Sequence, residues 1–174
     1  METVKTSFVR HVNPVERNIV ETALQAGSFT TLSYAFTVSK LDEELRGKGP
    51  FTIFAPTDAA FRKLLPDSLE SLMHEPKKLL AILNYHILRG CFRSRDLRQG
   101  EARTLEGTSL RLGATDDGYT VDYANITAKD TLCSNGVIHT IDTVLMPGHV
   151  REVSAAAMEE SPWSGKKRIV VSRY

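Results

Sequence analysis

Hydrophobic positions change their spacing near the middle of the chain. From residue 14 to about residue 83, apolar side chains recur every three or four positions, as on one face of an α-helix. From residue 86 onward, short apolar runs and alternating patterns replace that spacing. Helices that come first, with strands afterwards, favour an α+β domain with a largely antiparallel sheet.

Capping and breaking residues set the limits of the expected helices. Asn13 and Pro14 suit the N-cap and first position of a helix that ends at Gly27. A second helix is expected over residues 28–45, because residues 47–50 (Gly-Lys-Gly-Pro) break it. Shorter helices are expected at three places: after Thr57 or Asp58, over residues 68–73, and from residue 76 to residue 83.

The strands are predicted from short apolar or alternating runs. Residues 51–55 form one such run, and Pro56 ends it because proline has no N–H to donate to a neighbouring strand. The later strands are expected at residues 86–92, 102–105, 109–114, 119–123 and 137–145. At the start of the first of these, Tyr85 and His86 would be extended neighbours whose side chains point to opposite sides.

Three short motifs occur in order along these predicted elements. The first comprises Thr52, Phe54, Ala55, Pro56, Thr57, Asp58 and Phe61, the second Tyr85 and His86, and the third Gly136, Val137, Ile138, His139 and Asp142. In this order and at these distances they resemble the signature motifs of the fasciclin (FAS1) domain family. The resemblance covers about residues 18–147.

The resemblance implies a fold and a class of function. The fold is a wedge of mostly antiparallel β-strands with several helices packed on one side. The implied function is a non-enzymatic adhesion or protein-binding module at a cell surface or in a matrix, with no cofactor and with the Tyr-His region in contact with a partner. The predicted domain spans residues 14–147, between an N-terminal extension (1–13) and a C-terminal extension (148–174) with a basic tail.

The residues themselves give little support for catalysis. His139 and Asp142 are three apart in a predicted strand and would point to opposite faces, and no Gly-x-Ser-x-Gly nucleophile motif is present. A histidine and carboxylates inside apolar strands are costly unless paired, so His139, Asp142 and Asp58 are predicted to specify the fold.

The two cysteines leave two alternatives open. Cys91 and Cys133 have neither Cys-x-x-Cys spacing nor a zinc-finger histidine, so no metal site is predicted. Two reduced thiols are favoured for a chain without a visible leader, and a disulfide between them is the alternative.

Charge adds one candidate contact region. The formal net charge is only +1, which gives no reason to expect nucleic acid as a partner. Five arginines nevertheless lie between residues 89 and 103, directly after the Tyr-His pair. The candidate contact residues are Tyr85, His86, Arg89, Arg93 and Arg95, and they would favour an acidic protein or polysaccharide. A structural role is the alternative for Tyr85 and His86.

A different class of function also fits the sequence. A small-molecule or lipid-binding protein would use an apolar cleft between helices and sheet, and the residues that line a pocket cannot be told from those of a packed core by sequence.

The compartment is predicted from resemblance and from the N-terminus, which disagree. The family implies a secreted, periplasmic or cell-surface protein. The first 18 residues lack the apolar core of a secretory signal peptide, and no stretch of the chain is apolar enough to span a bilayer. A cytoplasmic protein is therefore the alternative.

Overall fold

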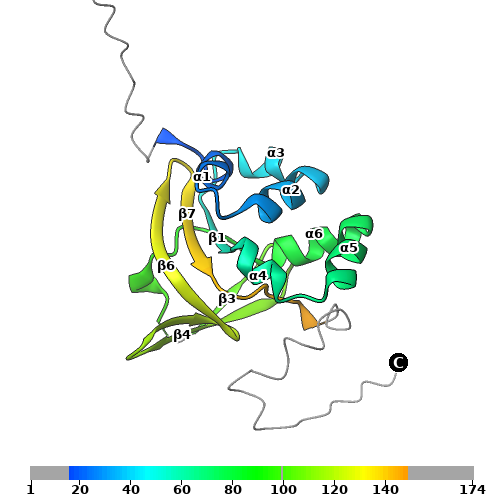
Figure 1. Cartoon of the computed structure of the whole chain (residues 1–174). Coiled ribbons are helices and arrows are strands. Elements are labelled where there is room, and N and C mark those ends of the chain that lie inside the picture. Colours follow the sequence, from blue (N-terminus) through cyan, green and yellow to red (C-terminus); the bar gives the residue numbers. More distant parts are fainter. Residues whose placement is uncertain (1–15, 99, 149–174) are drawn as a thin grey trace, which may run out of the picture.

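The computed structural model describes residues 16–98 and 100–148, which form one α+β domain (Figure 1). The helices are α1 (Ile19–Gln25), α2 (Thr30–Val38), α3 (Leu41–Leu45), α4 (Asp58–Arg62), α5 (Pro66–His74) and α6 (Pro76–Tyr85). The strands are β1 (Phe51–Pro56), β2 (Ile87–Arg89), β3 (Gly100–Arg103), β4 (Ser109–Thr115), β5 (Gly118–Val121), β6 (Ala124–Cys133) and β7 (Gly136–Ile141). The expected fold class is confirmed.

The seven strands form one sheet in the order β2-β1-β7-β6-β5-β4-β3. Every neighbouring pair is antiparallel except β1 and β7, which run parallel in the register Phe51 to Gly136. An isolated bridge between Leu88 and Thr104 joins the two ends of this order, so the sheet curls back on itself (Figure 1). Because β1 pairs with β7, the first strand of the domain lies beside the last one.

Two apolar clusters cover opposite faces of the central strands. The helices pack on the face that carries Ile53 and Ile138, together with Leu32 and Phe36 from α2. The other face carries Phe54, which packs with residues of β2, β4, β5 and β7. Strand β1 is buried along its whole length, because it has a cluster on each side.

The first predicted helix is wrong in its starting point. The backbone of Asn18 is extended, with φ −71° and ψ 170°, and α1 begins only at Ile19. Asn18 accepts a hydrogen bond from the Glu21 N–H, and the Glu21 side chain accepts one from the Asn18 N–H, which completes a capping box. Residues 13 and 14, which were expected to start the helix, lie outside the described residues, while Gly27 ends it as predicted, with φ +69°.

Among the other boundaries that differ from the sequence prediction, two change the number or the type of the elements. The single helix expected over residues 28–45 is two helices, because Lys40 adopts a left-handed conformation, with φ 58°, between α2 and α3. The strand expected over residues 86–92 is only the three residues of β2, and Tyr85 is the last residue of α6. The predicted extension at residues 1–13 and residues 149–174 of the predicted C-terminal extension lie outside the described residues.

Candidate functional site

The first motif joins two helix starts. The Thr57 hydroxyl accepts from the Ala60 N–H over 3.2 Å and caps α4. The carboxylate of Asp58 accepts from the N–H groups of Thr31 and Thr30, over 2.8 and 3.3 Å, at the start of α2. Partial burial raises the pKa of Asp58, but the hydrogen bonds from Thr31 and Thr30 outweigh it and leave the pKa below its usual value. The motif thus fixes α4 against α2.

Tyr85 and His86 are not extended neighbours, because they form the C-terminal end of α6. Their exposed fractions are 7% and 1%. The Tyr85 hydroxyl donates to the Asp122 carboxylate over 2.8 Å, in the turn between β5 and β6. Both side chains are buried, so neither offers an open surface to a partner in this arrangement.

Both ring nitrogens of His86 have backbone partners. The Leu145 N–H donates to Nε2 over 2.9 Å, so Nε2 carries no proton, and Nδ1 donates to the Ile82 carbonyl over 2.7 Å. Burial lowers the pKa of His86 to about 4, although the Ile82 carbonyl acts in the opposite direction. His86 is therefore a neutral ring that ties the segment after β7 to the end of α6.

The third motif begins with a crowded turn. The side-chain amide of Asn135 donates to the carbonyls of Leu45 and Gly47, over 2.6 and 2.8 Å, and its oxygen accepts from the Ile19 N–H over 2.9 Å. One buried side chain thus satisfies the end of α3 and the start of α1. At Gly136, a Cβ atom would lie 1.9 Å from the Phe51 carbonyl oxygen. Only glycine fits where β7 passes β1 at this point.

Asp142 closes the third motif at the end of β7. Its carboxylate accepts from the backbone and side-chain amides of Asn125, over 2.9 and 3.0 Å, and lies 3.9 Å from the Lys63 ammonium. Partial burial raises the pKa of Asp142, but the bonds from Asn125 outweigh it and lower the pKa. The side chain therefore holds the start of β6 against the end of β7.

The predicted arginine region is an exposed segment that buried groups hold in place. We call residues 89–98 the arginine loop; it contains the 3₁₀ turn η2 (Ser94–Asp96), and the side chains of Arg89, Arg93 and Arg95 are exposed on it. The Thr52 hydroxyl donates to the Gly90 carbonyl over 2.7 Å and accepts from the Phe92 N–H over 2.9 Å.

Two further side chains anchor the same loop. Nε2 of His139 donates to the Phe92 carbonyl over 2.7 Å, and Nδ1 accepts from the Asp130 N–H over 3.3 Å. The Asp130 carboxylate accepts from the Ser94 N–H over 2.7 Å and from the Ser94 hydroxyl. Burial lowers the pKa of His139, against the opposing effects of the Phe92 carbonyl and the Asp130 charge. No local sequence pattern indicated Asp130 or Ser94, because the two residues lie far apart in the chain.

This network does not have the geometry of a catalytic triad. The Ser94 hydroxyl donates to a carboxylate rather than to an imidazole, and both nitrogens of His139 already have partners. Cys91 and Cys133 are free thiols, so the predicted reduced state is the one in this structure. Within residues 16–98 and 100–148, no group of three or more histidine, cysteine or acidic side chains is arranged to hold a metal ion.

Two neighbouring hollows share Pro50 in their walls, beside the arginine loop. The first has a volume of about 350 Å³ and is lined by Gly49, Pro50, Phe51, Arg89 and Gly90. The second has a volume of about 230 Å³, and its lining includes Lys48, Pro50, Cys91 and Arg93. Both hollows therefore have cationic side chains in their walls.

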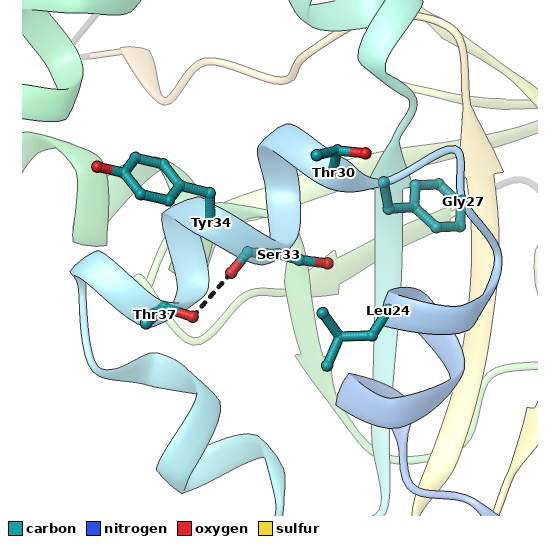
Figure 2. Close-up of a pocket in the computed structure, with 7 residues that line it drawn as sticks. Leu24, Gly27, Thr30, Ser33, Tyr34 and Thr37 are labelled. Carbon is teal, nitrogen blue, oxygen red and sulfur yellow. Dashed lines mark hydrogen bonds between the residues drawn. The ribbon is translucent and has the colours of Figure 1, made fainter.

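A third hollow lies between α1 and α2 and has a volume of about 280 Å³ (Figure 2). Leu24 and Tyr34, which are 57% and 60% exposed, stand at its rim, and the buried Ser33 hydroxyl has no hydrogen-bond partner among the described residues. This hollow opens on the helical surface. It does not lie between the helices and the sheet, where a cleft was expected. That interface is filled by the apolar cluster that contains Ile53 and Ile138. In the described part of the chain, no helix has the length and apolar character needed to cross a membrane.

Comparisons with known proteins agree with the motifs and the fold. The family model of the Fasciclin domain matches residues 27–147. The uncharacterised protein sll1735 of Synechocystis sp. is 39% identical over 132 residues, which are 75% of this chain and 98% of that protein. The cell surface glycolipoprotein MPB83 of Mycobacterium bovis is 36% identical over 99 residues, which are 57% of this chain and 44% of that one.

A solved structure shares the fold. It is a FAS1 domain pair from the insect cell adhesion molecule fasciclin I, with a TM-score of 0.68 and 20% sequence identity. The match covers 75% of this chain and 51% of that chain.

Proposed function

Because this chain belongs to the fasciclin domain family, we propose that it acts as a non-enzymatic binding module at a cell surface or in a matrix. The proposal assigns the contact to the arginine loop and the partner to an anionic protein or polysaccharide. Support for the location comes from MPB83, a relative that is named as a cell surface glycolipoprotein.

The main support for the proposal is that exposed cationic side chains lie on a segment whose backbone is hydrogen-bonded to buried side chains. Arg89, Arg93 and Arg95 are exposed, while the backbone between them is bonded to Thr52 and His139. A loop that is already ordered loses little conformational entropy when it binds, so its charges are available at a low entropic cost. Thr52 and His139 would then act in function by positioning the arginines, without touching the partner themselves.

The test is retention of the purified protein on sulfated, carboxylated and uncharged agarose, with elution by salt. The triple variant Arg89→Gln, Arg93→Gln, Arg95→Gln should elute at a clearly lower salt concentration than the wild type, with an unchanged circular dichroism spectrum. The matched control is Arg62→Gln, Arg103→Gln, Arg111→Gln, in which three other exposed arginines are neutralised. Equal elution of the two triple variants would show that the arginine loop is not the contact surface.

The location needs its own experiment. Fractionation of the source cells, with antibody detection and N-terminal sequencing of the recovered chain, should find the protein outside the cytoplasmic membrane. Recovery in the cytosol alone would rule out a role in surface attachment and would leave the arginine loop to an intracellular partner.

A further inference from the structure

The two hollows beside the arginine loop lie next to each other at Pro50. Pro50 contributes to both walls, so the hollows are neighbours separated by a single residue. Their volumes, about 350 and 230 Å³, lie near the lower limit of about 300 Å³ that is usual for small-ligand pockets. Each hollow therefore suits one small chemical unit, such as a sugar ring, and excludes an inserted helix.

Cationic side chains stand at both hollows. Arg89 lines the first hollow, and Lys48 and Arg93 line the second. Within residues 16–98 and 100–148, none of these three side chains forms an ion pair. Arg95, by contrast, lies 3.9 Å from the Asp96 carboxylate and lines neither hollow. Lys48, Arg89 and Arg93 are therefore the groups whose charge is open to a ligand.

The lining between these cations suits carbohydrate. Pro50 is exposed and presents an apolar ring, and the glycines at positions 49 and 90 line the same hollow with backbone that carries no side chain of its own. A sugar ring has both kinds of surface, with apolar C–H faces and hydroxyl groups at its edge. A carboxylate or sulfate on that ring would be in a position to pair with Arg89 or with Lys48 and Arg93.

An extended acidic peptide fits this surface less well. Such peptides bind by adding a strand to an open sheet edge. Strand β2 carries Arg89, but its outer side is occupied, because Leu88 is bridged to Thr104 and the Ile87 carbonyl accepts from the Leu105 N–H over 2.9 Å. The main chain beside the hollows is thus not available as a template for a peptide strand.

We propose that the paired hollows at Pro50 bind two neighbouring acidic sugar units of a linear polysaccharide, with Arg89 at one unit and Lys48 and Arg93 at the other. The inference rests on the proposed function, and it narrows the partner to one chemical class. It also adds Lys48, which precedes β1 and lies far from the arginine loop in sequence.

The experiment is calorimetric titration of the full chain, at low salt, with three probes of similar length. The probes are a sulfated heparin oligosaccharide, a carboxylated hyaluronan oligosaccharide and poly-L-glutamate. At least one oligosaccharide should bind more tightly than poly-L-glutamate. The variant Lys48→Gln, Arg89→Gln, Arg93→Gln should weaken that binding at least tenfold, and the control Arg62→Gln, Lys77→Gln, Arg111→Gln should change it less than twofold.

Two results would overturn the inference in different ways. Tighter binding of poly-L-glutamate, lost in the Lys48, Arg89 and Arg93 variant, would refute the polysaccharide but leave an anionic contact at the arginine loop in place. Equal affinities of both triple variants for every probe would refute the site and the proposed function together. Thermal unfolding of each variant keeps these results separate from a loss of fold, and all six positions are exposed.

Discussion

The Leu145 N–H donates to Nε2 of His86 across 2.9 Å, and this single bond joins the segment after the last strand to the end of α6. Nδ1 of the same ring is bonded to the Ile82 carbonyl. A proton on Nε2 would remove the acceptor that the Leu145 N–H needs and would place a charge in a fully buried position. The neutral form of His86 is thus part of the folded state.

Acid should destabilise the domain through the buried His86. The pKa of His86 is about 4 in the folded state and 6.5 for the free side chain, so the unfolded chain takes up a proton first as the pH falls. The stabilising effect of neutral His86 is complete above pH 6.5 and is lost between pH 6.5 and about 4, by about 3 kcal/mol in total. Urea unfolding at a series of pH values measures this slope.

The control for acid sensitivity is His74→Gln, which removes an exposed histidine. His86→Gln should lower stability at pH 7 and flatten the slope. A wild-type free energy of unfolding that stays constant from pH 6.5 to pH 4 would contradict the prediction. Below pH 4 a second loss is expected, because Asp58, Asp130 and Asp142 all have lowered pKa values and must then take up protons.

Gly136→Ala should destabilise the domain by at least about 3 kcal/mol, because the added methyl group would overlap the Phe51 carbonyl oxygen at 1.9 Å. Both atoms belong to paired strands, so neither can move without breaking the β1–β7 register. Gly100→Ala is the matched control, since the nearest atom to its Cβ would be 3.8 Å away. Thermal unfolding of the two variants should separate them by many degrees, and similar melting temperatures would contradict the close approach.

Asn135→Ala should cost about 2–4 kcal/mol, because it leaves the Ile19 N–H and the carbonyls of Leu45 and Gly47 without partners in a mostly buried place. Ser134→Ala, at the exposed neighbouring position, should change stability by less than about 0.5 kcal/mol. Chemical denaturation measures both. A small effect of Asn135→Ala would mean that water replaces the amide at both helix ends.

Thr52→Val should loosen the arginine loop while keeping the shape of the buried side chain. The variant removes both the bond to the Gly90 carbonyl and the acceptor for the Phe92 N–H. Hydrogen exchange at Phe92 should become at least tenfold faster, and trypsin should cleave the loop sooner. Thr127→Val on β6, where the hydroxyl is exposed, is the control. Unchanged exchange at Phe92 would show that Thr52 does not order the loop.

The sequence predicted the fold class and the buried centre of the sheet well, because these depend on strong local signals. The run that became β1 has apolar residues on both faces and a proline at its end. In contrast, β6 is the longest strand and was not predicted at all. It is largely exposed, with Asn125, Lys129 and Asp130 in its length, so hydrophobic alternation is absent.

Irregular backbone explains much of what could not be predicted from the sequence. The register between β6 and β7 shifts twice, and Asp130 adopts a positive φ of 57° there. That irregularity is what brings the Asp130 carboxylate to Ser94. No local pattern encodes a contact between residues so far apart in sequence, which is why the anchoring of the arginine loop could only be seen in the structure.

The parallel pairing of β1 with β7 has a consequence for synthesis. A ribosome makes β1 early, but the strand that lies next to it at the centre of the sheet is the last of the seven to appear. Until Ile141 has left the exit tunnel, β1 has only β2 beside it, and an apolar strand edge stays open. The nascent domain must therefore wait, unfinished and prone to wrong pairings, until almost its whole length has been translated.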